Sequence, residues 1–262
     1  MVNEVGEVGI DHDLISFSSE NISLLANGCI CCSVRTDLQE TLRDLFAQKR
    51  AGNVLDFDRV IVETTGLADP APVMQTLFSD TLLEAQFRLD GVLTLVDSVL
   101  GAHTLRAHPE ALKQVMMADA LFLTKTDLSS PAQRADCRAV LADLRPELEA
   151  QEVEQGRLEP SKLLGFGLAN QRDTEKFKRF FGQALDAESQ TEGKPLAQQW
   201  RSQHTAYRTQ TLRFDKAFTW VAFSEALDLL TRLRGADLLR MKGIVNVEGA
   251  PVVVQGVQHL IQ

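Results

Sequence analysis

Apolar runs and helical patterns alternate along the first two thirds of the chain. Three short apolar runs, each of about four to six residues, pass directly into polar residues. They occur in DRVIVETTG (58–66), DGVLTLVD (90–97) and ALFLTKTD (120–127). Continuous runs rich in β-branched residues are typical of strands buried on both faces of a sheet. Each of the three segments is therefore predicted to contain a β-strand.

Helical patterns lie next to these runs. Between residues 37 and 50 the apolar side chains recur at helical spacing, at Leu38, Leu42, Leu45 and Phe46. Residues 109–119 show a similar pattern. Alternating strands and helices predict an α/β domain with a mostly parallel sheet and flanking helices. Because ligands of such sheets bind beyond the carboxyl ends of the strands, we expect the endings ETTG, VD and TKTD to meet at one edge.

The last third of the chain has a different pattern. A period-2 segment at 207–214 predicts a strand, and FSEALDLLTRLRG (223–235) predicts a helix that ends at its glycine. The segment 243–257 predicts two strands joined by a turn at Glu248-Gly249. This order of elements predicts a small α+β domain.

A polar stretch separates the two regions. Residues 186–204 contain Gly, Pro and several Gln, and this composition is typical of a linker. We therefore predict an α/β domain over 1–185, a linker over 186–204 and an α+β domain over 205–262.

Composition narrows the functional classes. With 262 residues, of which 44% are hydrophobic, the chain can build a sizeable core. Its net charge of −9 argues against nucleic acid or an anionic membrane surface as the main partner. The sequence contains no apolar run of about 18 residues, the length that a membrane-spanning helix needs. The acidic start lacks the features of a signal peptide, so we expect a cytoplasmic protein.

Three of the four cysteines crowd into NGCICCS, at Cys29, Cys31 and Cys32. This crowding suits thiolate chemistry in a reducing compartment, either metal binding or redox chemistry, although three small buried side chains would give the same pattern. A redox role is less favoured, because CxxC spacing is absent and adjacent cysteines form a strained ring. Tetrahedral Zn²⁺ needs four ligands, so the trio needs a carboxylate, a histidine or a second chain to complete it, and His103 is one candidate. Cys137 lies on a helical pattern and is interpreted as a core residue.

The TKTD ending suits recognition of guanine. The Asp127 carboxylate can accept two hydrogen bonds from the N1–H and exocyclic amine of guanine, which adenine does not offer in that arrangement. The stem of Lys125 can lie flat on the base. The alternative is a solvated loop in which Asp127 caps the next helix.

The ETTG ending suits the Mg²⁺ side of a nucleotide site. Glu63 follows a buried run, and Gly66 could bring a bare N–H to a terminal phosphate. A strand end followed by a glycine turn is the alternative.

Five motifs occur in one order: VNEVGEVGIDHDLI, NGCICCSVRTDL, VIVETTGLADP, LVDSV and LTKTD. Together they resemble the CobW-type GTPases, P-loop proteins related to the nickel-enzyme maturation GTPases UreG and HypB. The segment RMKGIVNVEGAPVVVQGV similarly resembles the CobW C-terminal domain, so the likeness covers nearly the whole chain. The resemblance implies a P-loop-type sheet, slow GTP hydrolysis with Mg²⁺, and a client metalloprotein, and it leaves a homodimer open.

The resemblance also implies roles for individual residues. Glu63 would be the Walker B-type carboxylate and Gly66 the glycine that senses phosphate. Lys125 and Asp127 would contact guanine, with Thr124 where the family has Asn or Thr. The metal, Zn²⁺ or Co²⁺, would bind the cysteines of the CxCC element with Glu7 as a further ligand.

One motif of the family is absent from this sequence. No G-x-x-x-x-G-K-[ST] occurs, and the lone Gly193-Lys194 pair precedes a proline. We therefore expect the 262-residue chain to bind GTP poorly and its sheet to lack the central strand. The main hypothesis is a metallochaperone or insertase that couples GTP to metal handling. The alternative is a non-catalytic metal-binding or scaffold protein with a vestigial nucleotide site.

Overall fold

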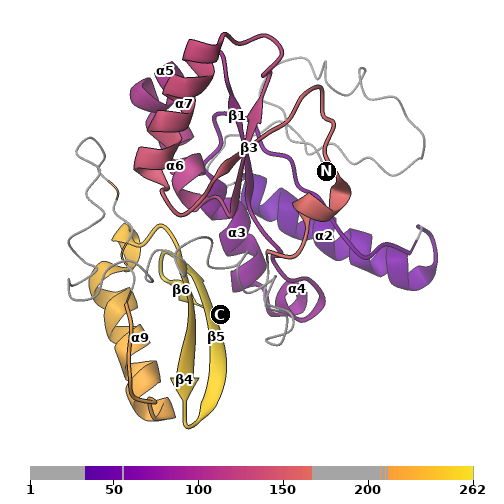
Figure 1. Ribbon diagram of the computed structural model, residues 1–262. Coiled ribbons are helices and arrows are strands. Elements are labelled where there is room, and N and C mark those ends of the chain that lie inside the picture. Colours follow the sequence, from indigo (N-terminus) through magenta and orange to yellow (C-terminus); the bar gives the residue numbers. More distant parts are fainter. Residues whose placement is uncertain (1–32, 55, 167–206, 208–209, 211, 262) are drawn as a thin grey trace. The chain divides into compact units, whose positions relative to one another are not determined.

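The computed structural model describes residues 33–54, 56–166, 207, 210 and 212–261 (Figure 1). The chain divides into two compact units, Met1–Arg88 and Leu89–Gln262. Each unit has its own core, and each is described by itself. Among the helices that the structure describes, none combines the length and the apolar character that crossing a bilayer requires.

The first unit is helical in its described part. It contains α2 (Ser33–Ala51), α3 (Pro70–Ser79) and α4 (Thr81–Gln86). The predicted helix at 37–50 is therefore confirmed and begins earlier. Its residues Leu38 and Leu42 are buried against Leu83 of α4. The buried Asp80 joins these helices, because it caps α4 and also forms an ion pair of 2.8 Å with Arg43 of α2.

The predicted strand at 58–66 is wrong for the described structure. The segment forms only a single-residue bridge at Glu63 and belongs to no strand in the described part of the chain. Val60 and Val62 pack against the helical core, whereas Ile61 between them is 74% exposed. An apolar run supplies side chains for one packed face, but a strand also needs a neighbour that provides ladder hydrogen bonds.

The second unit contains the predicted parallel sheet. Its strands are β1 (Leu93–Asp97), β2 (Ala120–Thr124) and β3 (Ala150–Glu152), in the order β1-β2-β3. The α/β class and the two longer strands are confirmed. The first four residues of β2 are buried, as predicted, but Leu95 of β1 is 68% exposed. Burial on both faces therefore holds for β2 and fails for β1.

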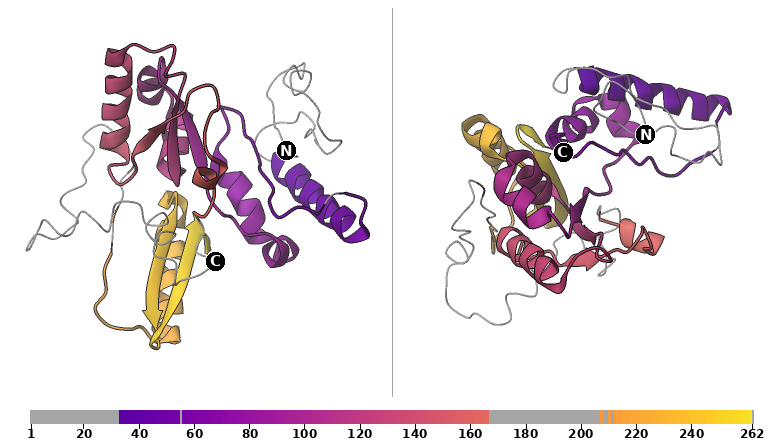
Figure 2. Two further views of the ribbon diagram at one scale, coloured as in Figure 1. Left: turned by 45° about the vertical axis from the view of Figure 1, so that its right-hand side comes forward. Right: turned by 90° about the horizontal axis from the view of Figure 1, so that it is seen from above.

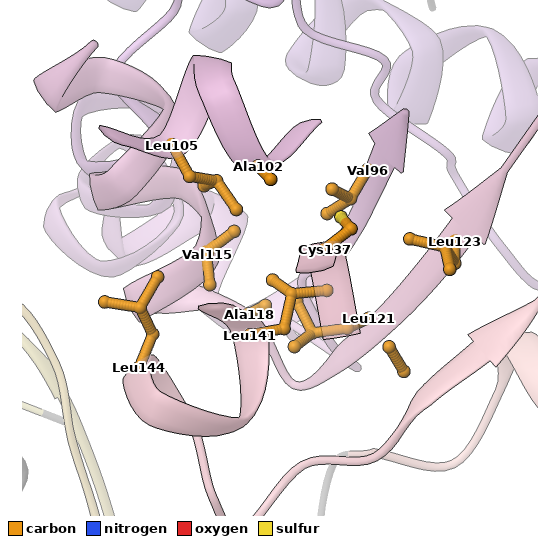
Figure 3. Close-up of a cluster of buried hydrophobic side chains, with 11 residues drawn as sticks. Val96, Ala102, Leu105, Val115, Ala118, Leu121, Leu123, Cys137, Leu141 and Leu144 are labelled. Carbon is orange, nitrogen blue, oxygen red and sulfur yellow. The ribbon is translucent and has the colours of Figure 1, made fainter. Parts of the chain in front are cut away.

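Three helices cover one face of this sheet: α5 (Gly101–Ala107), α6 (Pro109–Met117) and α7 (Pro131–Leu144). Figure 3 shows the apolar side chains that converge between the helices and the strands, including Val96, Leu121 and Leu141. Cys137 lies among them and is fully buried, so its prediction as a core residue is confirmed. Burial raises the pKa of its thiol, which keeps it protonated and unreactive.

The C-terminal segment forms a helix and an antiparallel sheet. The elements are α9 (Trp220–Arg234), β4 (Met241–Val247), β5 (Ala250–Val257) and β6 (Leu260–Ile261). Helix α9 lies along one face of the β4–β5 pair (Figure 2), where Phe223 is buried against Val247 and Val254.

The predicted turn at Glu248-Gly249 is confirmed. Both residues have positive φ, 52° and 88°, as a type I′ hairpin turn requires. The strand predicted at 207–214 is wrong for the residues of that segment that the structure describes, because none of them lies in a strand. Phe218 bridges to Val247 instead, so the chain pairs with β4 later than the alternation indicated.

A buried charge cluster joins β4 to the start of β2 within the second unit. The carboxylate of Asp119 lies 2.6 Å from Nη2 of Arg240 and also pairs with Nζ of Lys242. It accepts a third hydrogen bond of 2.8 Å from the N–H of Val92. Burial raises the pKa of Asp119, but the two cations outweigh it and hold the pKa below its usual value. The aspartate is therefore ionised in the folded protein.

Candidate functional site

The TKTD loop leaves the sheet at the carboxyl end of β2. Strands β1 and β2 are parallel and in register, with Asp97 opposite Thr124, so the VD and TKTD endings lie side by side as predicted. Lys125 has a left-handed backbone with φ of 56°. That conformation costs about 1–2 kcal/mol for a residue with a Cβ, and such strain concentrates at functional sites. The chain turns sharply here and presents Asp127 at the surface.

Lys125 is anchored on the neighbouring strand end. Its Nζ lies 2.8 Å from Oδ2 of Asp97, while Oδ1 of Asp97 accepts hydrogen bonds from the N–H groups of Val99 (2.7 Å) and Leu100 (3.2 Å). Partial burial raises the pKa of Asp97, but these hydrogen bonds outweigh it and hold the pKa below its usual value. The carboxylate is therefore a fixed anion beside the loop.

Hydrogen bonds from Arg134 and Ser98 fix the backbone of the TKTD loop. Arg134 of α7 donates hydrogen bonds of 2.7 Å to the carbonyls of Thr126 and Ser129. The hydroxyl of Ser98 donates to that of Ser129 at 2.9 Å, and the N–H of Ser98 donates to the carbonyl of Thr124 at 3.0 Å. Asp127 thus lies between two residues whose carbonyls are both fixed.

Asp127 does not cap the next helix. The N-cap of α7 is Ser130, which forms a capping box with Gln133, so the alternative of a capping aspartate is wrong. Within the described part of the chain, the Asp127 carboxylate has no hydrogen-bond partner, and it is exposed. Thr124 differs, because its hydroxyl donates a hydrogen bond of 3.2 Å to the carbonyl of Val96 and so joins the two strands. Two carboxylate oxygens are thus available to a ligand edge at Asp127.

The ETTG segment belongs to the first unit. Glu63 is exposed, and the chain turns through Gly66 before Asp69 caps α3 with a hydrogen bond to the N–H of Ala71 (2.9 Å). Gly66 does not have the positive φ that favours glycine, and a Cβ there would meet no atom within 4 Å. Neither local strain nor crowding within the chain explains a glycine at this position. The expected meeting of ETTG with the TKTD ending involves both units and stays a prediction.

The predicted metal ligands Cys29, Cys31, Cys32 and Glu7 lie outside the described residues, so their site stays a prediction. In the ranges that the structure does describe, no group of three or more His, Cys, Asp or Glu side chains is arranged to hold a metal ion. His103, the candidate for an additional ligand, is exposed on α5.

Asp97 is the residue to which the motifs assigned no role. Its position in the VD ending predicted only that it lies at the edge of the sheet formed by the carboxyl ends of the strands. The lysine amine reaches it from a residue with a left-handed backbone, and the sequence gives no sign of that conformation.

Comparison with known proteins adds the family. Residues 1–152 match the model described as CobW/HypB/UreG, nucleotide-binding domain, and residues 207–262 match the Cobalamin synthesis protein cobW C-terminal domain. The chain belongs to the CobW family. The resemblance drawn from the motifs is therefore confirmed.

Individual relatives agree with this assignment. The zinc chaperone YjiA of Escherichia coli (strain K12) is 32% identical over 260 residues, which cover 98% of this chain and 76% of YjiA. The zinc chaperone CobW of Pseudomonas aeruginosa is 28% identical, with 98% and 72% covered. The crystal structure of Zn(II)-bound YjiA GTPase from E. coli superposes with a TM-score of 0.61 at 26% identity, over 86% of this chain. The chain spans 65% of the length of that solved structure.

Proposed function

We propose that this chain functions in GTP-dependent zinc handling, as a metallochaperone or insertase that delivers the metal to a client metalloprotein. Relatives named zinc chaperone and a solved relative named GTPase support both halves of this function. Co²⁺ is the alternative cargo, since thiolate ligands accept either ion. The proposed location is the cytoplasm.

The GTP-binding part of the proposed function rests on one observation. The carboxylate of Asp127 is exposed on a loop whose backbone is fixed on both sides. An aspartate in this position can accept two hydrogen bonds from the Watson–Crick edge of guanine. A purine without the 2-amine loses one of them, and adenine places an acceptor where guanine has its N1–H. The stem of Lys125 supplies an apolar surface for the ring. Thr124 contributes by joining the strand ends beneath the base.

Glu63 and Gly66 suit the phosphate side. Glu63 is an exposed carboxylate at the end of an extended segment and would hold hydrated Mg²⁺. The open space around Gly66 fits the close approach of a terminal phosphate to its N–H. Mg²⁺ would neutralise phosphate charge and orient the nucleotide.

The cargo would bind at Cys29, Cys31 and Cys32, with Glu7 as the further ligand that a tetrahedral Zn²⁺ ion needs. These cysteines immediately precede α2, which begins at Ser33. In the sequence they also lie between the proposed switch segment around Glu7 and Glu63. A nucleotide that orders the switch would therefore alter the metal site. Because protonated thiols do not bind zinc, affinity should fall below neutral pH.

A second candidate is a zinc-binding or scaffold protein without catalysis. It requires only the cysteine cluster NGCICCS and no bound nucleotide. It is opposed by the TKTD loop, whose held conformation would have no use in a vestigial site.

Nucleotide selectivity distinguishes the two candidates. Guanosine, inosine and adenosine diphosphates are titrated into the ¹⁵N-labelled chain, and the amide shifts of the TKTD loop are followed. Base contacts alone predict a guanine dissociation constant on the order of 1 mM, with weaker inosine and adenosine binding. Asp127→Ala should abolish the preference for guanine over inosine. Equal shifts for all three nucleotides in the wild-type chain would refute the guanine site.

A further inference from the structure

We propose that Asp97 is a positioning residue for base recognition: it holds the Lys125 ammonium so that the lysine stem stays in place as the surface on which the purine ring lies. This inference rests on the proposed guanine site and adds a residue from the neighbouring strand to it. Asp97 itself reads no base edge.

The geometry gives Asp97 two separate tasks. Oδ1 accepts the two backbone hydrogen bonds of the turn after β1, from Val99 and Leu100. Oδ2 is directed to Lys125 at 2.8 Å. Because the turn fixes the carboxylate, the lysine amine has one defined position, and the four-carbon stem is held between that point and its own Cα.

The backbone of Lys125 makes the anchor useful. A left-handed residue directs its side chain away from the course of a regular strand, and φ of 56° places Lys125 in that region. An unanchored lysine side chain there would sample many rotamers and would lose conformational entropy on ordering against a base. With its amine held, the stem is ordered before the nucleotide binds, which is the general benefit of preorganisation.

A role in stability alone does not explain the pair. Lys125 and Asp97 have side-chain exposures of 57% and 28%, and ion pairs this exposed add little to folding. The loop backbone is already held by Ser98, Ser129 and Arg134, independently of the lysine amine. The ion pair therefore controls where the lysine side chain lies.

Asp97→Asn separates the two tasks. Asparagine keeps a carbonyl oxygen for the turn and loses the charge that holds Lys125. We expect guanosine and inosine diphosphates to bind roughly two- to fivefold more weakly, a factor typical of one exposed ion pair. The ratio between the two nucleotides should stay at the wild-type value, because Asp127 still reads the edge. Asp136→Asn removes the exposed pair with Arg106 at 2.6 Å and is the matched control, with no expected change in binding.

A double-mutant cycle tests the route of the effect. If Asp97 acts through the lysine, Asp97→Asn has no further effect in a Lys125→Gln background. The urea midpoint and the amide spectrum of each variant show whether it is folded. If Asp97→Asn perturbs the fold, Lys125→Gln alone still tests the stem, because it should weaken both nucleotides equally.

The outcomes are distinguishable. No guanine preference in the wild-type chain refutes the proposed function. A wild-type preference with unchanged affinity in Asp97→Asn overturns the positioning role and leaves the function intact. A changed ratio between guanosine and inosine nucleotides in Asp97→Asn also overturns it, because Asp97 would then act on the base edge.

Discussion

The buried cluster around Asp119 predicts a large loss of stability when its carboxylate is neutralised. Asp119→Asn keeps the shape and can still accept the hydrogen bond from Val92. It removes the carboxylate charge that pairs with Arg240 and Lys242, whose side chains are 11% and 13% exposed. Removing one partner from a buried ion pair typically costs about 3–5 kcal/mol, so we expect a loss of that size in the free energy of unfolding.

Replacing Lys242 should have the opposite effect on stability from replacing Asp119. The pKa of Lys242 falls from 10.5 to about 8, because burial, helped by Arg240 and Arg145, outweighs the attraction of Asp119. Asp119 is shared between Arg240 and Lys242. The shift corresponds to about 3 kcal/mol spent in keeping Lys242 charged in the folded state. Lys242→Met should therefore be neutral or stabilising at pH 7.

The pH dependence of stability follows from the same shift. Between pH of about 8 and 10.5, Lys242 is deprotonated in the folded chain and still protonated in the unfolded chain. The unfolded state then binds more protons, so this residue makes stability rise with pH in that window. Lys242→Met removes its contribution, and the difference between wild type and variant cancels the titration of every other group.

Urea unfolding followed by far-UV circular dichroism measures these effects at pH 7.5 and pH 9.5. Asp237→Asn, which removes the exposed pair with Arg234, is the matched control and should unfold with the wild-type midpoint. The reasoning is refuted if Asp119→Asn costs less than about 1 kcal/mol, well below the range for a broken buried pair. It is also refuted if the difference between wild type and Lys242→Met is the same at both pH values.

Three further predictions concern single residues. Gly249→Ala places a Cβ at φ of 88° in the β4–β5 turn and should cost about 1–2 kcal/mol, measured by urea unfolding; an unchanged midpoint would contradict the I′ turn. Ser130→Ala removes the N-cap of α7 and should cost about 1 kcal/mol, whereas Ser130→Asp should restore most of it if capping is the cause. Cys31→Ser should weaken zinc binding and release zinc at a higher pH, checked by competition with a chromogenic chelator; wild-type affinity would exclude Cys31 as a ligand.

Local patterns predicted the elements in which side-chain periodicity and turn chemistry agree. The apolar run 120–124 was predictable as a buried strand because helical patterns flank it on both sides. The hairpin at Glu248-Gly249 was predictable because apolar runs flank the pair on both sides and Gly249 tolerates positive φ. The segment 58–66 was not predictable, because pairing depends on a neighbour that the segment itself does not encode.

The sequence by itself determined the family, the strands β1 and β2, the β4–β5 hairpin and the chemistry available at each strand end. Those properties are local, since residue type and spacing carry them directly. Tertiary structure alone decided that Asp97 holds Lys125, that Ser130 rather than Asp127 caps α7, and that Asp119 is surrounded by cations from a segment more than a hundred residues away. Each of these depends on which backbones become neighbours in space, and burial then decides how strongly the paired charges act.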